Sequence, residues 1–301
     1  MAKNNSFTLA GRELHVAQSA ISREISLLED ELVEKLFKRM NKRIYLTAAG
    51  DVMLRHAHKV FQVLRNARME VSDVARLNRG VVRIGAGMTA CMYLVPQVLE
   101  RFRMLHPNLE ARVVSSSSDV LLSQILNNVL DLAVLTLPIA HRDLEAVPFL
   151  TEEMVLMTSP RHAELANRRV IRAREISRYP LIVFDKLAAT RGLIDRFFER
   201  EKVVPQIVME SETVAMIKPL VQINLGVSIL PLPAVIPEVR RGELHYLRFR
   251  EKLKRDIGLV YLKNDYQPRA VQELLELFRG EGKQARLHPE GKKRSAKASP
   301  N

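Results

Sequence analysis

The stretch SFTLAGRELHVAQSAISREISLLEDELVEKL, residues 6–36, decides how this chain begins to fold. If residues 18–28 form a helix, Ile21, Ile25 and Leu28 lie on one side of it, because their spacing follows the helical repeat. These side chains would form a single buried stripe. The spacing therefore predicts an amphipathic helix that packs against a second element.

A shorter helix is predicted just before this one. Thr8–Leu14 suits such a helix, and Ser6 suits its N-cap because a serine hydroxyl accepts a hydrogen bond from the first turn. His15–Ala17 then supplies the tight turn of a helix-turn-helix. Helical hairpins also occur in proteins that bind no DNA, so the pattern by itself leaves both interpretations open.

The outer face of the second helix carries short polar side chains and one cation. Such hydroxyl and amide groups can approach phosphates and base edges in a DNA major groove, where arginine or glutamine can bind one base through two hydrogen bonds. An ordinary solvated helix face is the alternative. The predicted DNA contacts on this face are Gln18, Ser19, Ser22, Arg23 and Ser26.

A cluster of cations follows the second helix. Lys38, Arg39, Lys42 and Arg43 surround a short turn. Ile44–Leu46 is typical of the returning strand of a hairpin. A basic hairpin, or wing, beside a recognition helix binds the phosphate backbone and adds affinity more than sequence choice. Lys42 and Arg43 therefore join the predicted DNA contacts.

A dense, ordered set of residues in this region matches a known pattern. Its members are Ser6, Phe7, Thr8, Ala10, Leu14, His15, Val16, Gln18, Ser19, Ala20, Ile21, Ser22, Arg23, Leu28, Glu29, Leu32, Leu36, Phe37, Arg39, Leu46, Thr47, Ala49 and Gly50. With these residues the chain resembles the LysR-type transcriptional regulators, and the resemblance continues to about residue 280. It implies a winged helix-turn-helix, a linker helix that pairs with its counterpart, and an effector domain like the periplasmic binding proteins.

Three departures from the family pattern bear on DNA binding. Family members have a further helix before the position of Ser6, where this chain has only Met1–Asn5. Ala17 replaces the usual serine and lacks a capping hydroxyl, a change worth about 1 kcal/mol. Val33 replaces a helix-ending glycine, although valine disfavours the left-handed conformation. An alternative function is therefore a dimerising, ligand-binding protein with impaired DNA binding, which would act as an interaction partner of full-length relatives.

Composition favours a multidomain protein with a polyanionic partner. The chain has 301 residues, 47% of them hydrophobic, and a formal net charge of +13 that is densest at its two ends. The polar start Met1–Ser6 is no signal peptide, and no apolar run is long enough to span a membrane. The single cysteine, Cys91, excludes an internal disulfide. We expect a cytoplasmic protein without membrane association.

A long helix without internal glycine or proline is predicted from Asp51 to Asn78, with Thr47 as its N-cap. Apolar residues recur along it at alternating spacings of four and three, which is a heptad seam. We favour a dimer seam over a helix that lies on its own domain, and dimerisation predicts a partly palindromic DNA site. The seam residues are Met53, Ala57, Val60, Leu64, Ala67, Val71 and Val74.

After Gly80 the pattern changes to alternating strands and helices, which predicts mainly parallel sheets covered by helices. The expected fold is therefore an N-terminal all-α winged helix-turn-helix, a long linker helix and a C-terminal α/β two-lobed, periplasmic-binding-protein-like domain. The predicted boundaries are 1–46 for the DNA-binding domain, 47–79 for the linker, 80–280 for the effector domain and 281–301 for a basic tail, with disorder predicted from Gly280. Lobe I covers about 80–156 and 257–280, and lobe II about 157–256.

Ligands of open α/β sheets bind beyond the carboxyl ends of the strands. Those ends carry hydroxyls and apolar side chains here, and hydroxyls with helix-start amides suit a carboxylate or another small anion. A solvated polar loop is the alternative for the serine run. The predicted effector contacts are Met88, Thr89, Ser115, Ser116, Ser117, Ser118, Leu137, Phe184 and Ser211.

Three other features of the sequence could indicate a different function. Gly85, Gly87 and Ala90 match a dinucleotide fingerprint, but the acidic residue expected at the end of the second strand is replaced by serines, so a nucleotide-dependent enzyme is the weaker alternative. Cys91 suits a buried small residue better than a redox sensor. The histidines show no metal-site spacing. The sequence thus predicts a homodimeric or homotetrameric, effector-controlled transcription factor that is not an enzyme and needs no metal or cofactor.

Overall fold

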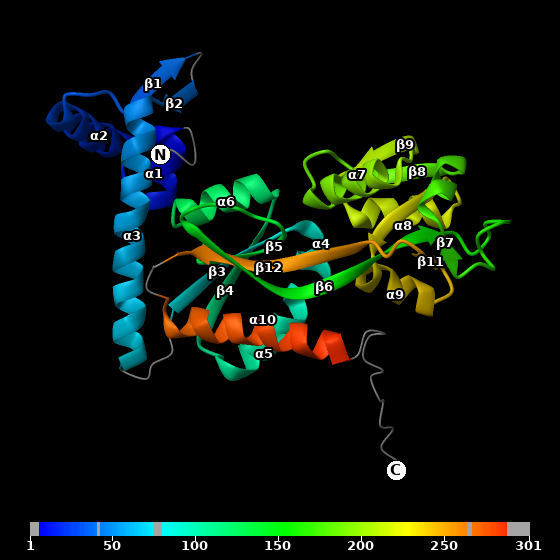
Figure 1. The fold of residues 1–301 in the computed structure, drawn as a ribbon. Coiled ribbons are helices and arrows are strands. Elements are labelled where there is room, and N and C mark those ends of the chain that lie inside the picture. The colour runs from blue at the N-terminus through cyan, green and yellow to red at the C-terminus, as the bar shows by residue number, and fades with distance from the viewer. Residues whose placement is uncertain (1–5, 41–42, 75–79, 264–266, 288–301) are drawn as a thin grey trace, which may run out of the picture. The chain divides into compact units, whose positions relative to one another are not determined.

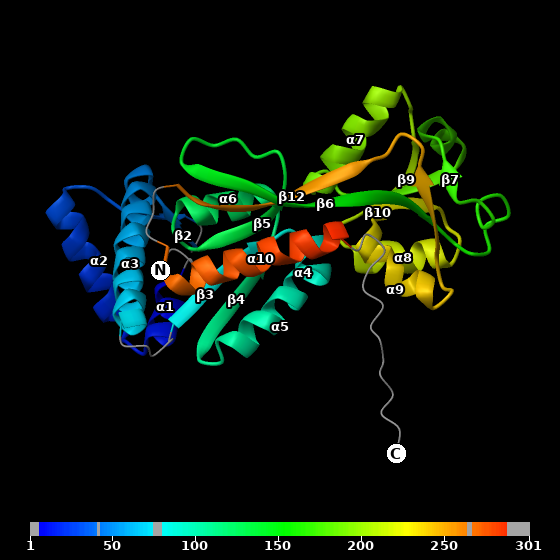
Figure 2. The same cartoon turned by 60° about the horizontal axis from the view of Figure 1, so that its bottom comes forward.

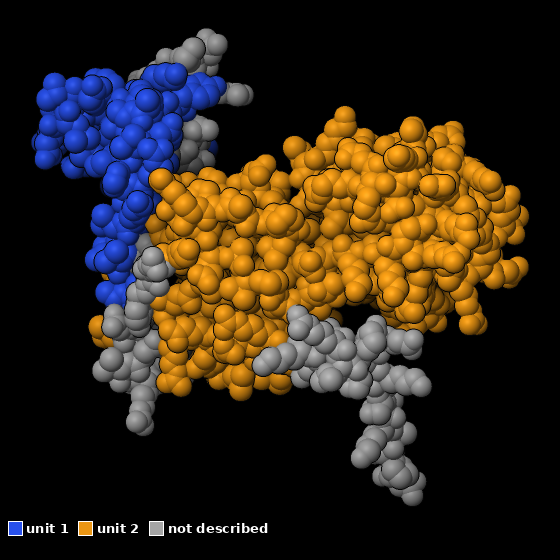
Figure 3. Space-filling view, viewed as in Figure 1, with its two compact units in different colours: residues 1–67 blue, residues 68–301 orange. Residues whose placement is uncertain are grey.

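The computed structural model describes residues 6–40, 43–74, 80–263 and 267–287. The chain divides into two compact units, residues 1–67 and 68–301, which Figure 3 colours separately. Each unit has its own hydrogen-bonded elements, and each is described below by itself.

Unit 1 contains the predicted helix-turn-helix and wing. Helix α1 (Phe7–Leu14) begins at Ser6, whose hydroxyl accepts a 3.3 Å hydrogen bond from the Leu9 amide. Helix α2 (Gln18–Leu32) follows the turn and has no side-chain cap at Ala17, as the sequence predicted. The wing is the antiparallel pair β1 (Phe37–Met40) and β2 (Arg43–Leu46).

The apolar stripe of α2 is less buried than its spacing predicted. Ile21, Ile25 and Leu28 are all half-buried, and within α2 it is Glu29 that is buried. The helix ends at Val33, which adopts the left-handed conformation with φ 55° and is 86% exposed. A β-branched residue therefore occupies the kind of backbone position that glycine usually fills.

Helix α3 (Ala48–Val74) is the long helix expected after the wing. The Thr47 hydroxyl accepts a 3.0 Å hydrogen bond from the Gly50 amide and so caps its first turn. A side chain at Gly50 would collide with the Leu36 carbonyl oxygen, which explains why the helix can approach the wing so closely.

Unit 2 consists of two α/β lobes joined by crossing strands (Figure 1). In lobe I, strand β3 (Gly80–Ala86) pairs in parallel with β4 (Leu109–Ser115) and β5 (Leu132–Thr136). Three helices accompany these strands: α4 (Met88–Tyr93), α5 (Val95–Leu105) and α6 (Ser118–Leu126). From sequence alone, Thr89–Leu105 suits a single helix after Gly87. In the structure this segment is divided at Leu94, because Pro96 near the start of α5 cannot donate a backbone hydrogen bond to α4.

Two long strands run through both lobes, as the green and orange ribbons of Figure 2 show. They are β6 (Leu144–Thr158) and β12 (Lys254–Leu262), which pair antiparallel with each other. From sequence alone, only Met154–Thr158 and Ile257–Leu262 suit strands here, so both observed strands begin earlier than their apolar runs. Through this pair the sheet is continuous across unit 2, in the order β4-β3-β5-β12-β6-β10-β8-β9, where β8 is Pro180–Phe184, β9 is Gln206–Ser211 and β10 is Val227–Pro231.

Lobe II repeats the parallel arrangement around β8. Strand β8 pairs in parallel with both β9 and β10, and β11 joins β6 to the short strand β7. The sequence missed α9, which contains two prolines, and β11. The elements are β7 (Val170–Ile171), a 3-10 helix (Ala173–Arg178), β8 (Pro180–Phe184), α7 (Ala189–Glu201), β9 (Gln206–Ser211), α8 (Val214–Gln222), β10 (Val227–Pro231), α9 (Leu232–Arg240) and β11 (His245–Phe249).

Alternating side chains of β5 divide the lobe I core between two faces of the sheet. Leu132 and Val134 pack with α5 and the C-terminal helix α10 (Arg269–Leu287), whereas Ala133 and Leu135 pack with α6. Lobe II has a separate core around β8 and β10. Each lobe therefore has a hydrophobic core of its own.

The prediction of disorder from Gly280 is wrong for Gly280–Leu287, which continue α10. Glu281 is buried and forms a 2.8 Å ion pair with Arg101 of α5. A side chain at Gly282 would collide with the Phe149 carbonyl oxygen, so this glycine permits close packing on β6. Residues 288–301 lie outside the described part of the chain.

Candidate nucleic-acid interface and interlobe site

The predicted recognition face of α2 is open to solvent. Gln18, Ser19, Arg23 and Ser26 are exposed, and Ser22 is half-buried. Because these positions follow the helical repeat, their amide, hydroxyl and guanidinium groups share one side of the helix. Such a surface offers hydrogen bonds to base edges and phosphates.

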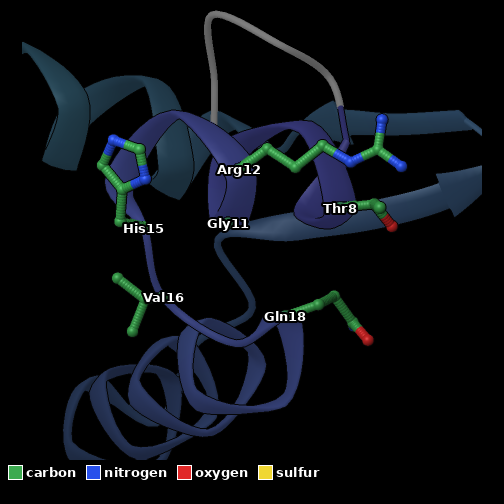
Figure 4. A pocket seen from close by; sticks show the side chains of 6 residues that line it. All are labelled: Thr8, Gly11, Arg12, His15, Val16 and Gln18. Atoms are coloured by element: carbon green, nitrogen blue, oxygen red, sulfur yellow. The ribbon is translucent and has the colours of Figure 1, made fainter.

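A pocket of about 390 Å³ lies where α1 meets the turn, lined by Thr8, Gly11, Arg12, His15, Val16 and Gln18. In Figure 4 the side chains of Thr8, Arg12 and Gln18 extend to one side, while His15 and Val16 lie on the other. A cation, a hydroxyl and an amide thus gather beside the start of α2. Thr8 and Arg12 were missed from sequence, although their spacing of four on α1 could have revealed them.

Glu29 connects α2 to the wing. Its carboxylate accepts hydrogen bonds from the amides of Leu36 (2.9 Å) and Phe37 (3.1 Å) and pairs with the Lys35 ammonium at 2.8 Å. Burial acts to raise the pKa of Glu29, but the bonds from Lys35, Phe37 and Leu36 together hold that pKa below its ordinary value. The carboxylate therefore stays charged and fixes the first strand of the wing.

The predicted wing contacts lie at the edge of what the structure describes. Lys42 is outside the described residues, and so is the side chain of Arg43, whose backbone pairs with Met40 in the hairpin. Both remain predictions.

A buried arginine lies between the two lobes. Arg255 of β12 is 2% exposed, and its Nε donates to the Glu152 carboxylate of β6 at 3.0 Å, with Nη2 contacting the same oxygen. Its Nη1 donates to the Thr89 hydroxyl of α4 and to the Thr190 hydroxyl of α7, each at 2.9 Å. One guanidinium thus connects the crossing strands to one hydroxyl of each lobe.

Of the predicted effector residues, Thr89 is the one held by this cluster. Its neighbour Met88 is 39% exposed, and its sulfur accepts a 3.8 Å hydrogen bond from the Ser115 hydroxyl. Ser116, Ser117 and Ser118 are half-buried around the start of α6, and Leu137 is half-buried against Gly258. The structure thus places Met88, Thr89 and Ser115 together.

Two other predicted effector residues have structural partners. Phe184 is 3% exposed and packs in the lobe II core, with its carbonyl accepting a 2.8 Å bond from Arg191. Ser211 is 6% exposed, and its hydroxyl exchanges 3.4 Å hydrogen bonds with the backbone of Thr213. The sequence missed Glu152, Thr190 and Arg255, because no local pattern marks residues so far apart along the chain.

A second contact between the lobes lies beside the first. Lys218 of α8 is 6% exposed, forms a 2.7 Å ion pair with Glu238 of α9, and places its ammonium 4.8 Å from the ring centre of Tyr93 on α4. This distance suits a cation–π interaction. Helix α4 is therefore held to lobe II at both ends, through Thr89 and through Tyr93.

Cys91 on the same helix is half-buried. Burial raises the pKa of its thiol, and a hydrogen bond with Ser115 offsets part of that rise. A raised pKa disfavours the reactive thiolate, which agrees with the structural interpretation of this cysteine.

The predicted seam of α3 is apolar and largely open. Val60, Leu64 and Val71 are 59%, 53% and 69% exposed, and Ala67 is exposed as well. Met53 and Ala57 are half-buried, and the side chain of Val74 lies outside the described residues.

Two further features are absent from the part of the chain that the structure describes. No group of three or more His, Cys, Asp or Glu side chains is placed to hold a metal ion there. Among the described helices, none combines the length and the apolar composition that a membrane-spanning segment needs.

Two family models together cover nearly the whole chain. The "Bacterial regulatory helix-turn-helix protein, lysR family" model matches residues 1–51, and the "LysR substrate binding domain" model matches residues 75–283.

Similar proteins carry regulatory names. The probable RuBisCO transcriptional regulator of Porphyra purpurea is 27% identical over 288 residues, which cover 92% of this chain and 91% of that protein. The HTH-type transcriptional regulator CfxR of Cupriavidus necator is 28% identical over 247 residues, or 82% of this chain and 77% of that protein.

Two full-length solved structures and one isolated regulatory domain share the fold of the parts of this chain that they cover. A full-length OxyR variant from Pseudomonas aeruginosa has a TM-score of 0.74 at 22% identity, covering 92% of this chain and 91% of that one. Full-length CbnR complexed with its target DNA has a TM-score of 0.67 at 20% identity, covering 93% and 95%. The regulatory domain of Synechocystis PCC6803 CcmR in complex with 2-PG has a TM-score of 0.63 at 24% identity, covering 68% and 98%.

Proposed function

The chain belongs to the LysR family of transcriptional regulators, and from that premise we propose how its own residues perform this function. Helix α2 reads DNA through Gln18, Ser19, Ser22, Arg23 and Ser26, with Lys42 and Arg43 of the wing on the phosphate backbone. A small-molecule effector binds between the lobes of unit 2. The regulator acts in the cytoplasm, where its DNA lies.

The exposed polar face of α2 is the observation that carries the DNA proposal. Arg23 and Gln18 are exposed on this face, and Arg12 and Thr8 of the adjacent pocket supply further phosphate contacts. Glu29 supports the proposal indirectly, because its bonds to Leu36 and Phe37 hold the wing beside the helix.

The exposed seam of α3 supports pairing with a second copy. Val60, Leu64 and Val71 expose apolar surface at heptad spacing, and burial of such surface stabilises association. A homodimer, or a homotetramer built from it, presents two recognition helices at a fixed separation, so the DNA site is partly palindromic.

Effector control follows from the joined lobes. An effector that binds one lobe arrangement better than the other shifts the population toward it, and an effector with equal affinity for both shifts nothing. Met88, Thr89, Ser115, Ser116, Ser117, Ser118 and Leu137 are the residues we place nearest to it. The change in lobe packing then alters the spacing or bend of the DNA that the oligomer engages.

A salt-dependent DNA titration of the full chain against the intergenic DNA beside its own gene tests the DNA proposal. We expect Arg23→Ala to weaken specific binding by about 1–3 kcal/mol while the oligomer stays intact. Arg200→Ala is the control, because this arginine is also exposed but lies in lobe II, where it pairs with Glu201. Unchanged affinity in the Arg23 variant contradicts the proposed reader.

The second candidate function is that of a ligand-binding dimer with impaired DNA binding. The uncapped start of α2 at Ala17 and the left-handed Val33 favour it, because both weaken the recognition helix. In the same titration, effector-dependent behaviour without sequence-selective DNA binding supports this second function.

The seam is tested by replacing one of its valines with a charge. We expect Val60→Glu to shift the protein to monomers in light scattering, because a charge would be desolvated at the interface. Val52→Glu is the matched control, since Val52 is also exposed on α3 but lies off the seam. Unchanged oligomers in the Val60 variant place the interface elsewhere.

A further inference from the structure

The Arg255 cluster has donors left over after its own contacts are counted. Thr89 and Thr190 each accept a hydrogen bond from Arg255 Nη1, so each hydroxyl keeps its own proton available to donate. Within the described residues neither hydroxyl donates a hydrogen bond to a protein acceptor. Two donors from two different lobes therefore meet at one guanidinium nitrogen.

The charge of this cluster is balanced from within. Glu152 is 8% exposed and is bonded to both Nε and Nη2 of Arg255, so the guanidinium is neutralised by a buried carboxylate. A cation that is almost free of solvent attracts an anion strongly, because water screens it little. Glu152 thus occupies the role that the anionic group of a ligand would otherwise fill.

We propose that Arg255 is the anion-recognition residue of the interlobe effector site and that Glu152 is its built-in competitor. The effector presents a carboxylate or phosphate group whose oxygens accept hydrogen bonds from Arg255 and from the Thr89 and Thr190 hydroxyls. This inference rests on the proposed effector site between the lobes and names its ligand chemistry.

Binding in this way is coupled to lobe movement. Thr89 belongs to lobe I and Thr190 to lobe II, and both are nearly buried, at 7% and 6% exposure. An anion oxygen reaches the pair when one hydroxyl leaves Nη1 and the oxygen inserts between them. In the free protein Arg255 holds the lobes together, and the effector replaces that direct link by its own hydrogen bonds.

Neutralising the competitor is the sharpest test. Full-length wild type and Glu152→Gln are compared by calorimetry and thermal shift at constant ionic strength with acetate, inorganic phosphate, 2-PG and, as an uncharged probe, glycerol. The amide keeps the shape of the carboxylate but removes its charge. We expect Glu152→Gln to bind at least one of the anions about tenfold or more tightly than wild type does. Acetate and phosphate separate a carboxylate from a phosphate ligand.

A second substitution in the Glu152→Gln background tests whether the increase in anion affinity depends on the hydroxyls beside Arg255. Thr190→Val removes one donor and is expected to abolish the tighter anion binding. Thr158→Val is the matched control, because this threonine is also buried, and its hydroxyl has no hydrogen-bond partner among the described residues. It should leave the anion affinity unchanged.

Three results overturn the inference: equal anion affinities in wild type and Glu152→Gln, an equal gain for glycerol, or equal losses from the two threonine variants. The DNA titration tests the DNA proposal independently of this inference. If Glu152→Gln gains anion affinity but the chain does not bind DNA, Arg255 remains the anion-recognition residue and the DNA proposal is wrong. If the chain binds DNA but Glu152→Gln gains no anion affinity, the DNA proposal stands and this inference is wrong.

Discussion

Two glutamates with the same burial have different structural roles in the two units. Glu29 in unit 1 and Glu152 in unit 2 are both 8% exposed. Glu29 is bonded to two backbone amides and to Lys35, which is itself 68% exposed. Glu152 is bonded to the side chain of Arg255, which is 2% exposed.

The difference lies in what remains when the carboxylate is lost. If Glu29 is removed, water can still solvate the exposed lysine. Two backbone amides then lack a hydrogen-bond acceptor, but no charge is left buried. Around Glu152, the loss leaves a guanidinium enclosed between two lobes, and an unpaired buried charge is costly. Unit 1 therefore uses its glutamate to fix local geometry, whereas unit 2 uses its glutamate to hold a charge in the interior.

The largest expected effect comes from removing Glu152. We expect Glu152→Ala to lower the unfolding free energy of unit 2 by about 3–5 kcal/mol, because Arg255 is left buried and unpaired. Glu153→Ala is the matched control on the same strand. Its partner Arg248 is 3.3 Å away and 43% exposed, so the loss should stay within about 1 kcal/mol. Denaturant titration measures the loss in each variant, and equal losses would show that Arg255 does not become a costly unpaired charge when Glu152 is removed.

The Arg255 cluster also marks the limit of what the sequence could predict. Thr89 was predicted because it follows a strand, and that signal is local. Glu152, Thr190 and Arg255 are distant in the chain and meet only through the pairing of β6 with β12 and the placement of α7. Strand pairing of this kind leaves no periodic trace, so the most buried part of the site became visible only in three dimensions.

A smaller effect is expected from removing Glu29. Glu29→Ala leaves the amides of Leu36 and Phe37 without their acceptor, and bonds of this kind to a charged group are worth about 1.5–3 kcal/mol. We expect unit 1 to lose stability in that range while unit 2 is unaffected. Glu31→Ala, an exposed position on the same helix, should change the stability by no more than about 0.5 kcal/mol. Circular dichroism of thermal unfolding separates the two variants.

The same residue predicts a pH dependence with a definite sign. The pKa of Glu29 in the folded protein lies below its ordinary value of 4.5. Near this pH the folded protein therefore binds fewer protons at Glu29 than the unfolded chain does. Its stabilising contribution is therefore fully present above the unfolded pKa and is lost as the pH falls through the lowered folded pKa. Below pH 4.5 wild type should lose stability more steeply than Glu29→Ala, and parallel curves would contradict this role.

The fold of unit 1 was largely predictable because its signals are local. Ser6 and Thr47 cap helices, as their residue types suggested. The apolar spacing of residues 18–28 likewise predicted the helix that the structure shows as α2. The burial of α2 was not predictable, since Ile21, Ile25 and Leu28 are only half-buried and a side chain's exposure depends on what packs against it. Gly282 gives the opposite lesson: glycine suggested disorder, but its lack of a side chain lets α10 pack on β6.

The smallest effect we predict is a gain in stability at Val33, the left-handed end of α2. Val33 has φ 55° and is 86% exposed, so a replacement gives up little packing and relieves an unfavourable conformation. Val33→Gly is expected to stabilise unit 1 by about 1 kcal/mol, the difference typical of a non-glycine residue forced into this region.

Val204 provides the matched control for this prediction, because it is also a valine and also 86% exposed, but it does not have a positive φ. At such a position glycine only adds freedom to the unfolded chain, so Val204→Gly should lower the melting temperature rather than raise it. If both glycine variants lower it, the left-handed end of α2 is held by contacts worth more than the strain of the valine. If only Val33→Gly raises it, the DNA titration repeated with that variant shows whether a firmer recognition helix also binds DNA more tightly.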